Sequence, residues 1–441
     1  MIKSIYIGQF FITGLVSIGL LFLFAYFFPL LLPFVKILFY AFCLLSILDV
    51  FLLYKNGPCL YVQRSLSDKF SNGDLNEVKI IIESKYPFDV WLKIIDEIPV
   101  QFQERNIQFE VKIAPGESKV IIYRLRPNKR GEYLFENINV FVQSAISLVN
   151  RRYSFALNKK VAVYPSFIQM HKYELLAISN RLHEVGIKKI RRLGHNIEFE
   201  QIREYVSGDD FRTINWKATA RKNDLMINQY QDEKSQEVYC IIDKGRCMKM
   251  PFNQMSLLDY AINAALVISN IAIKKGDKAG LISFSNNIET IIKAGNRGRQ
   301  MLDLSERLYH EETLFLESDY EKLFVSIRRK LNRRSLLLLF SNFETLSALK
   351  RQLPNLRRIA HQHLLVVIFF ENTELEQLLT SPVKTIEQVY LKTIAEKFAF
   401  EKKLIVKELL SYGIYSILTS PELLTVNTIN KYLELKARGL I

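Results

Sequence analysis

The chain has 441 residues, a formal net charge of +15, 49% hydrophobic residues and 24% charged residues. This length allows two or three domains with cores of their own, and the basic balance favours contact with polyanions or anionic lipid. The four cysteines show no C-x-x-C spacing, which argues against a zinc site or a disulfide framework and suits a reducing compartment.

Residues 1–56 predict a transmembrane helical hairpin. Residues 5–28 carry no charge and are long enough to span a bilayer, and a second apolar run extends from about residue 30 to residue 54. Lys36 lies near one end of the second run and Asp49 near the other, so both side chains could reach an interface. A cleaved signal peptide is the alternative, but the first run is too long and a second span follows at once.

The charges around the hairpin predict its orientation. Lys3 precedes the two runs, Lys55, Arg64 and Lys69 follow them, and the turn between them has no charge. The positive-inside rule therefore places both termini in the cytoplasm, with the chain anchored in the cell inner (plasma) membrane. The remaining residues, 57–441, should face the cytosol.

Residues 57–165 predict a small antiparallel β-sandwich. The expected strands are rich in β-branched and aromatic residues, and the turn signals "SNGD" and "APGE" lie between them. The clearest segments are 77–84, 89–96, 118–126 and 138–146. This domain is interpreted as a spacer and packing module, because nothing in it resembles a catalytic constellation.

Residues 237–441 predict an α/β domain with a doubly wound, mainly parallel sheet, because strands and helices alternate. Gly276 is placed to end the first helix, and Pro354 should break the third. The expected strands are 237–243, 278–285, 335–342, 363–370 and 414–419. The expected helices are 257–277, 320–331, 345–360, 393–413 and 425–439. Ligands of such folds bind beyond the carboxyl ends of the strands, where Asp243 lies.

Residues 166–236 form a connector that contains the motif "REYVSGDDFRTINWKATAR", residues 203–221. The spacing predicts a turn at Gly208 and a helix that begins at the N-cap Asp209 and ends near Arg221. Asp210 would add charge where the helix dipole favours it, and Asp209 could pair with Arg212. On spacing alone, the motif is a capped helix with internal ion pairs.

Two sharper interpretations of the motif find less support. Adjacent carboxylates can hold two metal ions for nucleotidyl transfer, but a further carboxylate and a phosphate-binding motif are missing. A nucleic-acid interpretation lacks aromatic interleaving, and neighbouring acids dilute the basic charge, so no nucleic acid is expected as a partner. The phosphate contacts would be Lys188, Lys189, Arg191, Arg192, Arg212, Lys217 and Arg221.

The motif resembles the signature of a group of membrane proteins called the domain of unknown function 58 family, roughly R-E-Y-x-x-G-D-D-x-R-x-I-x-W-K-x-x-A-R. The matching positions are Arg203, Glu204, Tyr205, Gly208, Asp209, Asp210, Arg212, Ile214, Trp216, Lys217, Ala220 and Arg221. The resemblance covers nearly the whole chain, including the hairpin, the β domain, "RPNKRGEY" (126–133), "VAVYPS" (161–166) and "YLELKARG" (432–439).

The resemblance implies a C-terminal domain similar to a von Willebrand factor type A domain. It also implies a MoxR-type AAA+ ATPase as partner, and no established enzymatic activity. Type A domains often hold Mg²⁺ through D-x-S-x-S after the first strand, with a Thr and an Asp from later loops.

The match to that metal motif is poor. Asp243 is followed by Gly245 and Cys247 where hydroxyls should be, Asn342 stands nearest the position of the later Asp, and Thr313 fits by order only. A thiol is a soft ligand that suits Mg²⁺ badly. No cofactor is therefore expected, and Asp243 could instead cap the following turn or hydrogen-bond a basic residue of the motif.

The expected function is non-enzymatic. The chain should be a membrane-anchored, cytosol-facing interaction module, working with a MoxR-type ATPase in assembly, metal insertion or envelope stress. Two alternatives remain open: a membrane-bound nucleic-acid or nucleotide-processing protein, and a purely structural scaffold.

Overall fold

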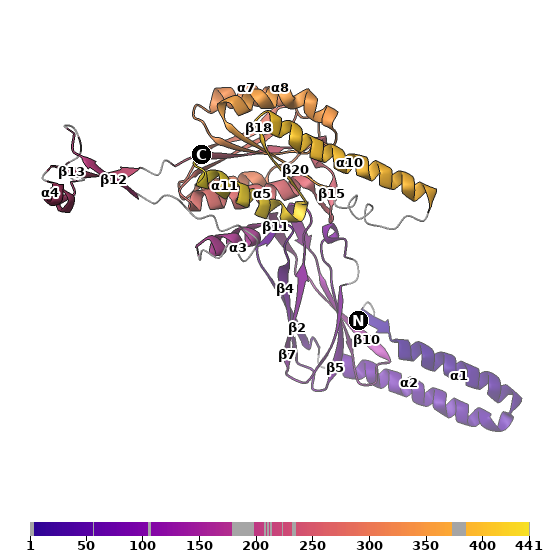
Figure 1. The fold of residues 1–441 in the computed structure, drawn as a ribbon. Coiled ribbons are helices and arrows are strands. Elements are labelled where there is room, and N and C mark those ends of the chain that lie inside the picture. The colour runs from indigo at the N-terminus through magenta and orange to yellow at the C-terminus, as the bar shows by residue number, and fades with distance from the viewer. Residues whose placement is uncertain are drawn as a thin grey trace. The chain divides into compact units, whose positions relative to one another are not determined.

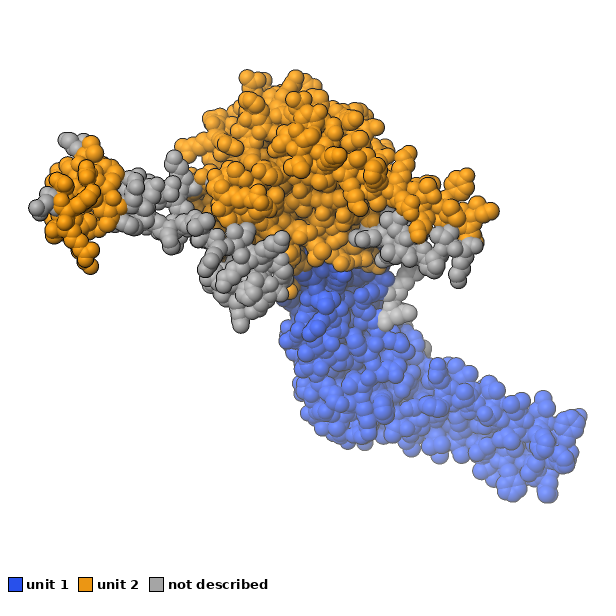
Figure 2. Space-filling model, in the orientation of Figure 1, with its two compact units in different colours: residues 1–164 blue, residues 165–441 orange. Residues whose placement is uncertain are grey.

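The computed structural model describes residues 4–55, 57–104, 107–178, 198–206, 209, 211, 214–222, 224–231, 235–372 and 385–440. The chain divides into two compact units, Met1–Tyr164 and Pro165–Ile441 (Figures 1 and 2), and each is described by itself.

The first unit begins with the two expected apolar helices. Helices α1 (Gln9–Phe27) and α2 (Leu32–Tyr54) are joined by a 3₁₀ turn, Pro29–Leu31, and both are long and apolar enough to cross a membrane. Only 11% of the most apolar window of each is buried, as expected of side chains that face lipid. One other described helix, α5 (Leu257–Lys274), meets the same length and hydropathy criteria, but 83% of its window is buried in the core of the second unit.

The rest of the first unit is β-sandwich-like. Its three sheets have the strand orders β1-β10-β9-β5-β6, β2-β4-β7 and β3-β11-β8. One core lies between inward-facing residues of β2, β4, β5 and β9, including Val62, Ile80, Leu92 and Val140. The strands are β1 Ile5–Ile7, β2 Leu60–Leu66, β3 Lys69–Ser71, β4 Asn76–Ser84, β5 Val90–Asp96, β6 Gln108–Ile113, β7 Ser118–Leu125, β8 Gly131–Phe135, β9 Ile138–Gln143, β10 Val149–Phe155 and β11 Lys159–Tyr164.

The helical hairpin is tied to this β region at both ends. Strand β1, just before α1, pairs antiparallel with β10. Near the end of α2, the buried Asp49 carboxylate accepts hydrogen bonds from the Ser144 hydroxyl and from the backbone N–H groups of Leu148 and Val149, both at 2.9 Å. The loop before β10 thus supplies the donors that this buried carboxylate needs, and the position of Asp49 relative to a membrane interface stays a prediction.

Replacing Asp49 should loosen this junction. We expect Asp49→Ala to lower the free energy of unfolding by about 2 to 4 kcal/mol, since three donors lose a charged acceptor. Urea unfolding of the full-length protein in detergent micelles measures the change. Asp89→Ala is the matched control, because the Asp89 side chain is 49% exposed in a surface pair with Lys112. Equal losses for the two variants would contradict the assignment.

The second unit is built on a six-stranded sheet with the order β18-β17-β14-β19-β20-β21. All neighbouring pairs are parallel except β17 with the edge strand β18, which is antiparallel. Its strands are β14 Glu237–Asp243, β17 Lys278–Phe284, β18 Ile288–Gly295, β19 Leu336–Phe340, β20 Leu364–Phe370 and β21 Tyr415–Thr419. The described strands of this unit outside the sheet are β12 Glu198–Glu204, β13 Met226–Gln231, β15 Pro251–Phe252 and β16 Met255–Ser256.

Helices cover both faces of the sheet (Figure 1). Alternate residues of β14 enter different cores: Val238 and Ile242 join the core with α5 and α11, while Tyr239 and Ile241 join the core with α7, α8 and α10. Burial on both faces explains why the central strands are continuous apolar runs. The helices are α3 Phe167–Ile178, α4 Trp216–Lys222, α5, α6 Gln300–Tyr309, α7 Tyr320–Lys330, α8 Leu346–Gln362, α10 Ile386–Ser411 and α11 Leu424–Ala437.

The prediction of a break at Pro354 is wrong, and α8 continues through this residue. Pro354 is exposed, so the carbonyl that its ring displaces can tilt towards water. An interior proline costs about 3 kcal/mol. Four buried residues of α8, Leu349, Leu353, Leu356 and Ile359, each contribute about 1.5 to 3 kcal/mol, so packing outweighs the proline.

Candidate functional site

The carboxyl edge of the sheet centres on Asp243, which is fully buried at the end of β14. Its carboxylate accepts hydrogen bonds from the Gly245 N–H at 2.8 Å, the Ser341 hydroxyl at 2.6 Å, the Tyr320 hydroxyl at 3.0 Å and the Ser318 hydroxyl. Burial raises the pKa of Asp243 above its usual range, although the four donors act in the opposite direction. Of the two roles expected for Asp243 in place of metal binding, the structure shows the cap on the following turn.

These residues do not fit a Mg²⁺ site of the adhesion type. A side chain at position 245 would place its Cβ 1.9 Å from the Ser318 Oγ, so Ser318 occupies the space of the hydroxyl that the metal motif requires. Thr313 is engaged elsewhere, since its hydroxyl donates to the Lys244 carbonyl at 2.7 Å and accepts from the Phe315 N–H. Within the described ranges, no three His, Cys, Asp or Glu residues are grouped to hold a metal ion.

A buried ion cluster beside Asp243 was missed in the sequence. The Lys244 ammonium, 1% exposed, pairs with Glu311 at 2.6 Å and with Glu289. Burial alone would raise the pKa of Glu311, but Lys244 and the hydroxyls of Thr290 and Ser283 outweigh it and hold that pKa below its usual range. The three charged residues are far apart in the sequence, so no spacing could have indicated the cluster.

The 203–221 motif lies on a β-hairpin with a short helix. Strands β12 and β13 pair antiparallel, and α4 lies between them in the chain. Arg203 donates two hydrogen bonds to the Asp209 carboxylate, at 2.6 and 2.8 Å, and the Val206 N–H donates a third at 2.8 Å. Arg203, followed by the Val206 N–H, holds the pKa of Asp209 below its usual range. The pair therefore closes the loop that follows β12.

The helix of the motif begins later than expected. Asp209 is not its N-cap: α4 starts at Trp216, and the Asn215 side chain accepts the capping hydrogen bond from the Ala218 N–H at 3.0 Å. Ile214 forms an extended bridge with Ile227, which prevents a helix from passing through that position. The expected Asp209–Arg212 pair cannot be compared, because Gly208, Asp210 and Arg212 lie outside the described residues.

The motif hairpin presents aromatic side chains to solvent. Phe211 is 72% exposed and stacks on Tyr205 with ring centroids 5.6 Å apart, and Trp216 is 70% exposed. The charged positions Glu204, Lys217 and Arg221 are also exposed. Lys222 and Glu204 form a weak surface pair at 3.4 Å. Solvent-facing aromatics beside charged residues have the composition of a binding surface.

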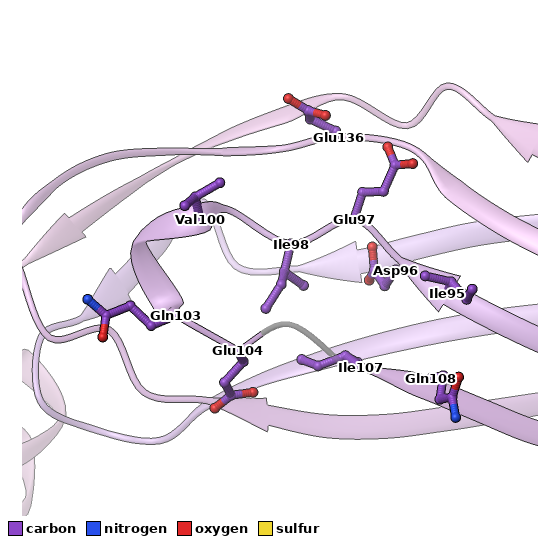
Figure 3. A pocket seen from close by; sticks show the side chains of 10 residues that line it. All are labelled: Ile95, Asp96, Glu97, Ile98, Val100, Gln103, Glu104, Ile107, Gln108 and Glu136. Atoms are coloured by element: carbon purple, nitrogen blue, oxygen red, sulfur yellow. The ribbon is translucent and has the colours of Figure 1, made fainter.

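An acidic cleft of about 1010 Å³ lies in the β-sandwich-like region (Figure 3). The carboxylates of Asp96, Glu97, Glu104 and Glu136 line it, and Asp96, the last residue of β5, and the following Glu97 have partners inside the fold. Asp96 is buried and binds Arg64 and Tyr123, while Glu97 accepts from the Asn139 amide at 2.5 Å. Burial raises the pKa of Asp96 against the effect of Arg64. Through these contacts, Asp96 and Glu97 link the end of β5 to β2, β7 and β9.

Comparisons with known proteins agree with the motif. A family model described as "Protein of unknown function DUF58" matches residues 201–381. The uncharacterized protein YeaD of Bacillus subtilis (strain 168) is 25% identical over 282 residues, covering 60% of this chain and 66% of YeaD. The chain is thus similar to DUF58 proteins. The match spans a little less than two thirds of YeaD's own length.

Solved structures add little. The CARDB domain of the PF1109 protein from Pyrococcus furiosus is 22% identical, with a TM-score of 0.18, and covers 24% of this chain and 86% of its own. The ASH/PapD-like domain of human CEP192 is 13% identical, with a TM-score of 0.18, and covers 24% and 89%. Scores this low carry no argument about fold or function.

The packing of Ser318 against Gly245 can be tested with a double-mutant cycle. We expect Gly245→Ser to lower the free energy of unfolding by about 1 to 2 kcal/mol, because Ser318 must turn away from Asp243. Ser318→Gly alone should cost about 1 kcal/mol through the lost donor. The double variant should lose less than the sum, since the new hydroxyl gains the vacated space. Strictly additive losses in urea unfolding would contradict this geometry.

Proposed function

We propose that this protein is a membrane-anchored, cytosol-facing protein-interaction module and not an enzyme. The observation that carries the proposal is the exposure of Phe211 and Trp216, 72% and 70%, on the motif hairpin. Large aromatic side chains dominate the binding energy of protein interfaces, and leaving two of them in water is unfavourable without a partner.

The sheet edge supports a non-catalytic role. Ligands of parallel α/β sheets bind beyond the carboxyl ends of the strands. At that edge the Asp243 carboxylate is committed to four internal donors, and Lys244 to Glu289 and Glu311. We further propose that residues 237–441 form a doubly wound domain similar to a von Willebrand factor type A domain, whose metal site has been replaced by these internal contacts.

The proposed partner is a MoxR-type AAA+ ATPase, as the family resemblance implies, and the pair would act in assembly, metal insertion or envelope stress. The proposed location is the inner membrane, with both termini in the cytoplasm. Lys55, at the end of α2, and Arg64, in β2, follow the apolar helices on the side that the positive-inside rule assigns to the cytosol.

A pull-down from membranes tests the role of the hairpin. Tagged full-length protein is crosslinked, solubilised and captured, and its partners are identified by mass spectrometry. We expect an AAA+ ATPase with the wild type and an approximately tenfold or greater loss with a Phe211→Ser, Trp216→Ser double variant. Both side chains are exposed, so the variant should unfold like the wild type.

Leu302→Ser is the matched control, because Leu302 is 69% exposed on α6 and lies outside the motif. It should leave the recovery of the ATPase unchanged. Equal recovery with the double variant would remove the hairpin from the interface. Recovery of other proteins, but of no AAA+ ATPase, with the wild type would overturn the proposed partner.

A further inference from the structure

A second exposed surface lies at the sheet edge, independent of the motif hairpin. A groove of about 470 Å³ runs between the N-terminal half of α10 and the segment around β15, above the ends of β19, β20 and β21. Apolar side chains form most of its wall: Met250, Pro251, Phe252, Leu257, Phe370, Leu391, Ile394, Phe398, Leu418 and Pro421. The groove shares no residue with the motif.

One apolar stripe of α10 is buried in the C-terminal half of the helix and partly exposed in its N-terminal half. In the C-terminal half, Ile405 and Leu409 are buried in the core of the second unit. The same face continues towards the N-terminus at helical spacing through Phe398, Ile394 and Leu391, which are 39%, 48% and 53% exposed. Figure 1 shows this half of α10 extending beyond the sheet. Within the described part of the chain, these three side chains of a core-type face are therefore partly exposed where the sheet ends, while the neighbouring Ala395 is buried.

A lysine lies among these apolar groups. Lys402 is partly buried, its ammonium donates to the Asn342 Oδ1 at 2.7 Å, and it lies 5.6 Å from the centroid of the Phe369 ring. An ammonium has three N–H donors, and in the described part of the chain only the Asn342 bond is formed. Burial lowers the pKa of Lys402 from 10.5 to about 8, against the opposing effect of Glu344, Cys247 and Glu371.

We propose that the groove binds a peptide segment of a partner protein in which apolar side chains flank one Asp or Glu, and that this carboxylate pairs with the Lys402 ammonium. Lys402 is already partly desolvated in the free protein, so forming the pair mainly costs the desolvation of the peptide carboxylate, and the ammonium gains a charged acceptor. The apolar side chains of the segment would cover Leu391, Ile394 and Phe398 in the manner of a helix in a groove.

The charges around the groove favour a peptide over a fatty acid. The exposed carboxylates of Glu344 and Glu371 also line it, together with Lys403. A peptide can offer basic side chains and backbone N–H groups to these acids, whereas a hydrocarbon chain offers neither. The stripe from Leu391 to Lys402 is about 16 Å long at 1.5 Å per residue, which matches about three turns of a bound helix.

The test uses full-length protein in lipid nanodiscs and a phage-displayed library of random peptides of about 16 residues, counterselected against Lys402→Met. We expect the enriched peptides to combine apolar residues at helical spacing with an Asp or Glu. For the best synthetic peptide, changing that acid to its amide should weaken binding roughly tenfold or more, and Lys402→Met should do the same. The two changes together should cost little more than either alone.

Lys407→Met is the matched control, because Lys407 is an exposed lysine on the same helix outside the groove, and it should leave binding unchanged. Ile394→Asp, at an exposed wall position, should weaken binding while the protein still folds. Enriched peptides without an acid, no enrichment over Lys402→Met, or equal binding of acid and amide peptides would each overturn the proposal. Saturable, Lys402-dependent binding of dodecanoate without any peptide binding would replace the peptide with a lipid.

Discussion

The buried carboxylate of Asp243 holds one edge of the six-stranded sheet together. Its donors come from the turn after β14, from the segment before α7, from α7 itself and from the end of β19. A carboxylate that leaves water without such partners costs several kcal/mol, and the four donors together offset that cost at this edge. This constraint fixes the loops at the end of the sheet where ligands of related architectures bind. It also explains why this chain has a glycine at position 245, since Ser318 needs the space.

The helices and strands could be predicted from the sequence where their burial leaves a local pattern of apolar residues. Strands β14, β19 and β20 are covered on both faces and are therefore continuous apolar runs, and α7 has an apolar stripe and a basic last turn. The edge strand β18 and helix α6 were missed. Strand β18 is covered incompletely, so its residues alternate poorly. The helix break predicted at Pro354 was wrong, because that prediction used the low helix propensity of proline and not the packing of α8.

The contacts of the candidate site were harder to predict from the sequence, because they join residues that are distant along the chain. The Asp209 carboxylate is bound by Arg203 from the preceding strand, a partner that the helical spacing of the motif did not suggest. The loop after β12 brings these two residues together. Likewise, Lys244 follows β14, Glu289 lies on β18 and Glu311 follows α6, so they meet only through the order of the strands in the sheet. Tyr205 and Trp216 were recognised in the sequence as positions of the motif, whereas Phe211 was not, and the exposure of Phe211 and Trp216 depends on the hairpin.

Each unit exposes an apolar helix surface, and the two surfaces differ in the polar groups that they contain. This difference indicates what each surface can bind. Around α1 and α2 most exposed side chains are apolar, Lys36 is the exposed charge, and the buried acid, Asp49, is bound by the β region. Such a surface suits lipid, which offers no hydrogen bonds. Along α10 the exposed apolar stripe ends at Lys402, whose ammonium makes one hydrogen bond among the described residues, and the acids Glu344 and Glu371 lie at the rim of the groove. Lipid tails would leave those groups unsatisfied, whereas a folded or helical peptide can satisfy them and the apolar stripe at once. The polar groups within an apolar surface therefore distinguish a helix whose surface suits lipid from a helix whose surface suits a protein partner.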